Sequence, residues 1–304
     1  MKNKNLKYHI LAIITICIWG TTFISTKVLM NDGLSPVEIF LYRFLLAYIC
    51  IWFFSPKVIF SKNYKDEFLF LLIGLFGGTI YFITENIALK LSLTSNVSLI
   101  LSTNPIVTAF FTILINKKEK VTKNLVYGSL LALFGVFLVI FNGSFILEIN
   151  FWGDLLALTA VLSWTIYTLI LNKLSNTYSI LFITRKLFFY GIVTIIPFIL
   201  IAPFKFQKDL LLTPTVIFNL LFLGIIASMV CFFTWNLSIK KIGIIKTTNY
   251  IYLVPLIAII SASIILKERI TMITFLGTVC ILSGVYVSEN GVTIKRKTKL
   301  KYNN

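Results

Sequence analysis

The sequence predicts an all-α integral membrane protein with ten transmembrane helices, arranged as two inverted five-helix repeats. Hydrophobic residues make up 58% of the 304 residues and charged residues only 13%, whereas a soluble domain carries about 25% charge. A helix needs about 20 apolar residues to cross a bilayer, and the chain contains ten such runs. Motifs of the first half also recur in the second half. This composition excludes a water-soluble fold and leaves no room for a soluble catalytic domain.

Each predicted helix is an apolar run that ends at charged residues, at proline, or at Asn and Gly. The shortest connections, residues 90–93 and 267–270, require tight turns at the membrane surface. Nine or eleven helices remain as alternatives, and either count would place the two termini on opposite sides. The ten runs cover residues 8–30, 36–54, 68–89, 94–115, 124–141, 151–173, 179–201, 216–237, 247–266 and 271–288.

The first apolar run follows Lys2, Lys4 and Lys7, an order that resembles a signal peptide. The run continues from Tyr8 to Met30 without a small-residue cleavage site, so we interpret it as a first, uncleaved helix. The four cysteines all lie inside apolar runs without Cys-x-x-Cys spacing, which favours small packing residues over disulfides or metal ligands.

The net charge of +17 comes from 28 Lys and Arg residues against 11 Asp and Glu residues. Nineteen of the 28 fall on the side of the N-terminus and five on the opposite side. Because cytoplasmic loops collect Lys and Arg, this distribution predicts that both termini are cytoplasmic in a multi-pass protein of the cytoplasmic membrane. The basic charge therefore indicates topology and not a nucleic-acid partner. Residues 290–304 form a basic tail, which we expect to hold the C-terminus inside.

An internal repeat appears at a spacing of about 150 residues. A Glu-x8-Gly-x6-Gly-Val pattern occurs twice, and so does an upstream set that includes Phe82 and Phe232. Five helices is an odd number, so the second half must enter the membrane upside down relative to the first. We therefore predict one repeat over residues 8–143 and a second over 151–289, an architecture typical of secondary transporters. The matched residues are Gly74, Phe82, Asn86, Lys90, Pro105, Glu119, Gly128, Gly135 and Val136 with Gly224, Phe232, Asn236, Lys240, Pro255, Glu268, Gly277, Gly284 and Val285.

Glycines seven residues apart lie on one face of a helix. We expect Gly128 with Gly135, and Gly277 with Gly284, to let the fifth and tenth helices approach a neighbour closely. Gly74 and Gly78 offer the same device in the third helix.

Several short motifs recur in a fixed order along the chain: Trp19-Gly20-Thr-Thr-Phe23 in the first helix, Arg43-Phe44 in the second, the helices containing Pro105 and Pro255, and the paired glycine helices. In these motifs the chain resembles the EamA-type transporters of the drug/metabolite transporter superfamily. The resemblance implies ten helices in two repeats and a carrier of small metabolites, often an exporter of amino acids. The lysine-rich Asn116-Lys-Lys-Glu119 segment departs from the family pattern.

Charged residues inside predicted helices are candidates for function because they are costly in a membrane. Arg43 and Arg185 lie at similar depths from opposite faces, as two gate residues would; snorkelling to the interface is the alternative, and we expect it for Lys27 and Lys186. Glu85 and Glu38 lie near the depth of Lys27 and Arg43. For these two acids, charge pairing is favoured over a proton relay.

Polar and aromatic residues near helix centres would suit a small zwitterion or an aromatic metabolite. Asn104-Pro105 carries extra weight, because proline frees a backbone carbonyl one turn back and can bend a helix towards a cavity; Pro255 holds the equivalent place. With the charged candidates, the predicted substrate-pathway residues are Trp19, Thr22, Arg43, Glu85, Asn86, Asn104, Trp164, Tyr167, Arg185, Trp235, Asn236, Asn249 and Tyr250.

Enzyme motifs are missing from the sequence, which has neither a His-Glu-x-x-His, a Gly-x-Ser-x-Gly nor a phosphate-binding loop, and only one histidine, His9. We therefore expect no cofactor, metal or catalytic residue.

The prediction is a secondary transporter that exports an amino acid or related small metabolite by alternating access. Import, an intramembrane lipid-modifying enzyme, and a passive channel or structural subunit remain as alternatives. The expected partners are the substrate and membrane lipids, with the chain a monomer or a homodimer.

Overall fold

The computed structural model describes residues 5–55, 60–92, 94–115, 122–141, 150–201, 208–257, 260 and 272–290. All regular elements in these ranges are helices. The first half contains α1 (Leu6–Asn31), α2 (Pro36–Phe54), α3 (Tyr64–Gly74), η2 (Leu75–Ile80), α4 (Tyr81–Leu91), α5 (Thr94–Leu101), α6 (Asn104–Ile115) and α7 (Lys123–Phe141). The second half contains α8 (Phe151–Leu174), α9 (Ile180–Ile201), α10 (Lys208–Leu211), α11 (Pro214–Leu221), η3 (Phe222–Val230), α12 (Cys231–Ile242), α13 (Ile244–Asn249), η4 (Tyr250–Leu253) and α15 (Met272–Asn290).

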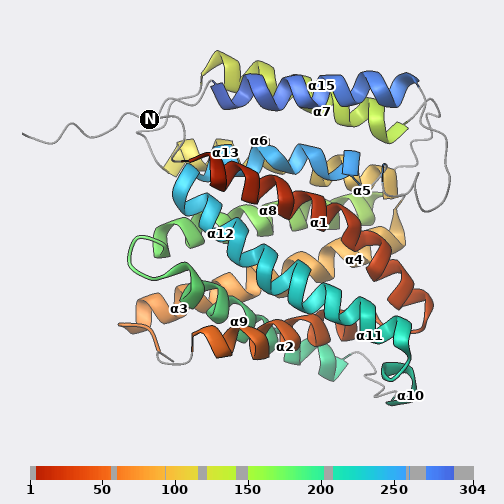
Figure 1. The fold of residues 1–304 in the computed structure, drawn as a ribbon, viewed down its shortest axis with the longest axis vertical. Coiled ribbons are helices and arrows are strands. Elements are labelled where there is room, and N and C mark those ends of the chain that lie inside the picture. The colour runs from red at the N-terminus through yellow and green to blue at the C-terminus, as the bar shows by residue number, and fades with distance from the viewer. Residues whose placement is uncertain are drawn as a thin grey trace, which may run out of the picture.

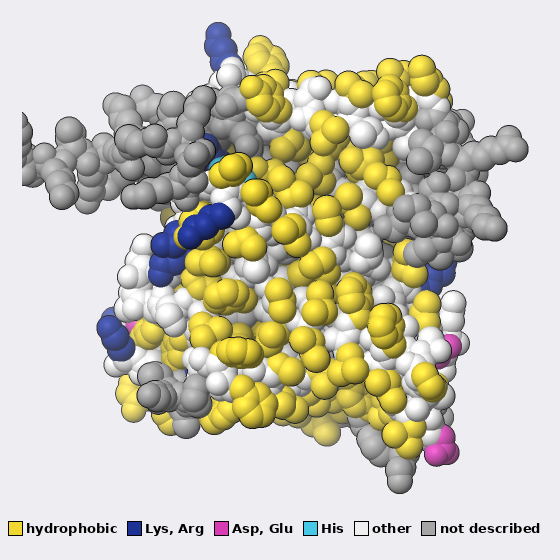
Figure 2. Space-filling view, in the orientation of Figure 1, with side chains coloured by type: hydrophobic (Ala, Val, Ile, Leu, Met, Phe, Trp, Pro, Cys, Tyr) yellow, Lys and Arg dark blue, Asp and Glu magenta, His cyan; other side chains and the backbone are white. Residues whose placement is uncertain are grey.

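The predicted all-α membrane fold is confirmed. Among the described residues, eight helices are long and apolar enough to cross a membrane, and Ile244–Ile257 and Met272–Ser288 are two shorter apolar helices. Most of the later part of the predicted ninth run, 247–266, lies outside the described residues. Hydrophobic side chains cover most of the molecular face seen in Figure 2, while Lys and Arg gather at one edge of it. Exposed apolar side chains such as Phe53, Leu200 and Ile201 are suited to contact the lipid hydrocarbon of a bilayer.

Helix α2 shows how local sequence sets a boundary. The Ser35 hydroxyl accepts a hydrogen bond from the backbone N–H of Glu38 at 3.3 Å, and the Glu38 carboxylate accepts one from the backbone N–H of Ser35 at 2.7 Å. Together with Pro36 this capping box starts the helix at the predicted residue. Glu38 thus has a capping role that the charge-pairing interpretation did not anticipate.

Two crossing segments contain π-helical turns, η2 between α3 and α4, and η3 between α11 and α12. They occupy equivalent places in the two halves. Adding the repeat spacing of 150 to the residue numbers of Leu75–Ile80 gives 225–230, which is the last part of Phe222–Val230. Insertions of this kind are frequent at functional sites. Both lie at closely packed glycines: a Cβ atom at Gly74 would clash with the backbone of Tyr190 and Gly191, and one at Gly224 would lie 2.6 Å from Cβ of Leu46.

Helices α7 and α15 run side by side along one edge of the molecule (Figure 1). Gly135 faces Gly277, and Gly128 faces Gly284, so closely that a Cβ atom at Gly135 would lie 2.6 Å from the carbonyl oxygen of Gly277. The predicted close approach of the fifth and tenth helices is confirmed, and each helix is the neighbour of the other.

Candidate functional site

A cavity of about 470 Å³ lies in the centre of the bundle, within the range of about 300–1,000 Å³ usual for small-molecule sites. Its walls come from α1, α2, α4, α5, α8 and α12, with contributions from the start of α6 and from η4 and the turn after it. Seven of the thirteen predicted pathway residues line it, together with Pro255: Trp19, Thr22, Arg43, Glu85, Asn86, Asn104 and Trp164.

The mouth of the cavity lies at the end of the bundle where α1 ends and α2 begins. Lys27 and Asn31, both exposed, line it there, as does Leu89 near the end of α4. We call this the open end, and the opposite end, which includes the first turn of α1, the closed end. Lys27 is exposed, as its expected snorkelling requires.

Aromatic side chains form the inner part of the cavity. The Trp19 ring centroid lies 5.5 Å from those of Trp164 and Phe232, and the Tyr81 ring lies 5.0 Å from Trp164. The Trp19 indole donates a hydrogen bond to the carbonyl oxygen of Ala227 at 2.9 Å. The buried indole nitrogen of Trp164 has no hydrogen-bond partner among the described residues, and such a group is costly unless something else accepts its proton.

Arg43 and Glu85 present opposite charges to this cavity. Both side chains are largely buried, at 5% and 7% exposure. The Arg43 guanidinium donates through Nε to Ser228 Oγ at 2.9 Å and lies over the Phe82 ring at 4.5 Å. Glu85 Oε1 accepts a hydrogen bond from the Tyr81 hydroxyl at 3.1 Å. Among the described residues the two charges form no direct ion pair with each other or with any other group, but they are near enough to attract each other. The charge pairing expected for Glu85 therefore takes the form of an attraction to Arg43 without direct contact.

Asn104 ties the broken fourth crossing segment to the cavity wall. The chain leaves the helical path at Ser102 and Thr103 and resumes at Asn104-Pro105. The Asn104 amide donates to the carbonyl oxygen of Val161 at 3.2 Å. In the second half the 3₁₀ turn η4 directly precedes the segment with Pro255, so both prolines lie at a change of helical path.

The other predicted pathway residues lie outside the cavity. Tyr167 and Asn236 form a hydrogen bond of 2.5 Å, and the Asn236 amide donates to Thr184 Oγ1 at 3.0 Å. Trp235 is fully buried beside them, 5.1 Å from Trp19. Asn249 donates to Ser288 on α15 at 2.9 Å, and the Tyr250 hydroxyl lies 2.8 Å from His9 Nδ1.

Arg185 lies at the closed end, well away from the cavity lining. Its guanidinium donates to the carbonyl oxygen of Ser55 and lies between the rings of Trp52 and Phe182. Arg43 faces the cavity, whereas Arg185 lies at the closed end and is not among the cavity-lining residues.

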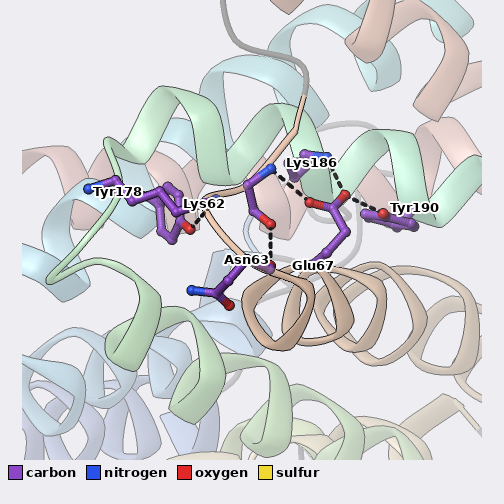
Figure 3. Close-up of polar contacts among 7 residues, drawn as sticks. Lys62, Asn63, Glu67, Tyr178, Lys186 and Tyr190 are labelled. Carbon is purple, nitrogen blue, oxygen red and sulfur yellow. Dashed lines mark hydrogen bonds and ion pairs between the residues drawn. The ribbon is translucent and has the colours of Figure 1, made fainter.

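A polar cluster of Glu67, Lys186, Tyr190 and Ser61 joins α3 to α9 at the closed end (Figure 3). The Glu67 carboxylate accepts hydrogen bonds from the Lys186 ammonium, the Tyr190 hydroxyl and, at 2.9 Å, the backbone N–H of Ser61. Lys186 is only 4% exposed, so the expected snorkelling of this lysine is wrong. Sequence analysis missed the cluster because Glu67 falls just outside the apolar run 68–89, whereas the helix begins at Tyr64.

Tyr178, in the connection between α8 and α9, extends the same contact region. Its hydroxyl donates to Asp66 Oδ2 at 2.7 Å and accepts from the backbone N–H of Lys62 at 2.9 Å. Burial, together with the Asp66 carboxylate, raises the pKa of Tyr178. The phenol therefore keeps its proton and remains a donor to Asp66.

Cavity residues that sequence analysis did not select include Tyr81, Phe82 and Phe232. The internal repeat carried a usable signal, because Phe82 and Phe232 are matched positions of the two halves. Both rings lie against the same cavity, and Phe232 packs 5.9 Å from Trp164.

The EamA-like transporter family matches the chain twice, over residues 6–141 and 151–289. The chain belongs to this family. It is a membrane transporter and not an enzyme. The expected resemblance to EamA-type transporters is thereby confirmed, and the double match follows the two halves of the chain.

Similar proteins cover nearly the whole chain. An "Uncharacterized transporter" of Archaeoglobus fulgidus is 28% identical over 93% of this chain and 98% of its own length. A "Probable amino-acid metabolite efflux pump" of Escherichia coli is 26% identical over 97% of this chain and 98% of its own length. A solved crystal structure superposes with a TM-score of 0.74 at 16% identity, over 93% of this chain and 98% of that chain, which shows the fold.

Proposed function

We propose that this EamA-family transporter exports a small metabolite, an amino acid or a related compound, across the cytoplasmic membrane by alternating access. The observation that carries the proposal is the central cavity, which is open at one end of the bundle and closed at the other by the contacts of Glu67 and Arg185. Two similar proteins, of Escherichia coli and Salmonella typhimurium, each carry the name "Probable amino-acid metabolite efflux pump", which supports an outward direction and an amino-acid-like substrate.

The proposed topology has both termini in the cytoplasm, with repeats over residues 8–143 and 151–289 and a basic tail over 290–304. The 19-to-5 distribution of Lys and Arg supports this orientation. The open end then faces the outside. Of the tail, the structure describes only residue 290. We propose a monomer or a homodimer in the lipid bilayer, with no nucleic acid and no cofactor.

The unequal surroundings of one matched pair support alternating access. Asn86 of α4 lines the open cavity, whereas its match Asn236 of α12 is fully buried and bonded to Tyr167. A second conformation in which these surroundings are exchanged would expose Asn236 towards the closed end. In this proposal Arg43 serves the open side and Arg185 the closed side, while Pro105 and Pro255 mark the bends.

Cysteine labelling of intact cells tests the proposed orientation. In a variant with the four native cysteines replaced by alanine, Thr26→Cys and Ser98→Cys place thiols on the cavity wall, and Ile183→Cys places one at the buried start of α9. A membrane-impermeant maleimide added outside is expected to label the first two and spare the third. Labelling of the cavity thiols only after the cells are opened would contradict the orientation.

Metabolite pools test the function itself. Cells that express the intact protein are compared with cells that express the Arg43→Ala/Arg185→Ala variant at equal membrane levels, across amino acids, nucleobases and sugars. Export predicts that a metabolite accumulates in the medium only with the intact protein. A metabolite that instead accumulates inside would establish import. Equal pools in both strains would refute transport of these compounds, and flux in vesicles without saturation or counterflow would indicate a channel.

A further inference from the structure

The inner part of the cavity holds one cation and one anion that attract each other but form no direct ion pair. Arg43 and Glu85 are each less than one-tenth exposed and line the same cavity. No nitrogen of Arg43 lies within 4.0 Å of a carboxylate oxygen of Glu85. Buried charges normally pair because their desolvation is expensive. Two opposite charges that line one cavity without touching each other therefore point to an occupant that contacts both.

Both groups keep hydrogen-bonding capacity for such an occupant. Arg43 uses Nε for Ser228, and among the described residues its two terminal amino groups have no bond assigned. A guanidinium with these groups free can bind a carboxylate through two parallel hydrogen bonds. Glu85 uses Oε1 for the Tyr81 hydroxyl, which leaves Oε2 available to an ammonium group.

The other charged residue of the lining, Lys27, lies at the mouth and is exposed, so water solvates it. The inner cavity thus has one positive and one negative group. A ligand of zero net charge with a carboxylate and an ammonium group satisfies both, whereas an anion or a cation leaves one buried charge without a partner.

The remaining lining accepts an apolar or aromatic side chain. Trp19, Trp164 and Phe232 have ring centroids 5.5–5.9 Å apart, and Phe40 and Ile16 add apolar surface. Offset and edge-on packing of a further ring fits such an arrangement. The unpartnered indole nitrogen of Trp164 is one more donor available to a bound molecule.

We propose that the cavity selects a zwitterionic α-amino acid with an apolar or aromatic side chain, whose carboxylate is bound by Arg43 and whose ammonium group is bound by Glu85. The inference rests on the proposed transport function and narrows its substrate class. It assigns Arg43 and Glu85 separate roles, so each should control discrimination against a different analogue.

The test uses three ligands that share one ring: L-phenylalanine, 3-phenylpropanoate, which lacks the ammonium group, and phenethylamine, which lacks the carboxylate. Their dissociation constants are measured by calorimetry with the purified protein in lipid nanodiscs at pH 7. The intact protein is expected to bind phenylalanine at least about tenfold more tightly than either analogue, as charge-assisted hydrogen bonds predict.

Two variants separate the roles. Arg43→Gln should abolish the preference for phenylalanine over phenethylamine and keep its preference over 3-phenylpropanoate. Glu85→Gln should give the opposite pattern. Lys173→Gln and Asp32→Asn remove one exposed charge of each sign outside the cavity and should leave all three dissociation constants unchanged.

Several outcomes would overturn the inference. They are equal binding of phenylalanine and one analogue by the intact protein, no binding of any of the three, or an equal loss for all three ligands in Arg43→Gln, which would mark a structural role. If none binds while cells still export another metabolite, the zwitterion assignment fails and the proposed function stands. If the binding pattern is as expected but no efflux is found, the proposed export is refuted, and the assignment of a zwitterionic ligand to Arg43 and Glu85 is retained.

Discussion

Replacing Glu67 with glutamine is expected to open the closed end of the transporter. The Lys186 ammonium is buried, and its one ion pair within the described residues is with Glu67. Removing the carboxylate leaves a buried cation without a counter-charge, which costs about 3–5 kcal/mol for a fully buried pair. Glu67 is 21% exposed at its side chain, so water offsets part of this loss. We expect a cost of about 2 kcal/mol to the closed conformation, or a shift of roughly 30-fold towards the other one.

Maleimide reactivity measures that shift. With the native cysteines replaced by alanine, the Ile183→Cys thiol is buried at the closed end and should react slowly. Its reaction rate should rise by roughly 10- to 100-fold when Glu67→Gln is added. The Thr26→Cys thiol on the cavity wall should become correspondingly less reactive.

A double variant separates loss of the ion pair from general loosening. Replacing both partners, as in Glu67→Leu/Lys186→Met, removes the uncompensated charge, and such replacements are often neutral. The double variant should therefore react more slowly at Ile183→Cys than Glu67→Gln does. A double variant as reactive as the single one would show that the Glu67 charge does not hold this end closed.

The helical architecture was predictable because each helix that crosses a membrane needs its own continuous apolar run, which is visible in the sequence. The first eight predicted apolar runs correspond to helices long enough to cross a membrane. Helix α2 spans the predicted residues 36–54 because proline and a capping box start it. The hydropathy pattern of the sequence did not predict the two π-helical turns, because these turns depend on how closely packed glycines contact neighbouring helices. It also placed the start of the third helix too late, since Asp66 and Glu67 lie in the first turn of α3 and are polar.

The site was only partly predictable, for a different reason. An internal repeat shows which residues are equivalent, but a single conformation gives equivalent residues different surroundings. Asn86 and Asn236 match in sequence, yet one lines the cavity and the other is packed against Tyr167. Arg43 and Arg185 differ in the same way. In the proposed alternating-access mechanism, which member of each pair faces the cavity depends on which end of the bundle is open, and that is a property of the whole assembly of helices.

Enlarging a glycine between α7 and α15 is expected to give a large loss of stability. A Cβ atom at Gly135 would lie 2.6 Å from both the carbonyl oxygen of Gly277 and the backbone nitrogen of Ile281. Backbone atoms cannot rotate away as a side chain can, so the two helices must separate along their length. We expect Gly135→Ala to cost about 1–3 kcal/mol, the range for overpacking, and Gly135→Leu to prevent stable folding. Thermal unfolding followed by size-exclusion chromatography measures both.

The control position lies on the same helix but faces outward. Leu131→Val changes an exposed side chain of α7 and should leave the unfolding temperature nearly unchanged. No residue of α7 or α15 is among those that line the cavity. The Gly135→Ala protein that does fold should therefore bind substrate with unchanged affinity, and a changed affinity would show that this helix pair communicates with the cavity.

Pairs of substitutions distinguish helix separation from local strain. Gly135 faces Gly277, and Gly128 faces Gly284. If the first alanine moves the helices apart, a second alanine opposite it enters space already opened and should cost less than it does alone. Gly135→Ala/Gly277→Ala should therefore be more stable than the sum of the single losses predicts. Additive losses would instead mean that each glycine accommodates its methyl group by local backbone adjustment, and the close approach of the two helices would not be what these glycines stabilise.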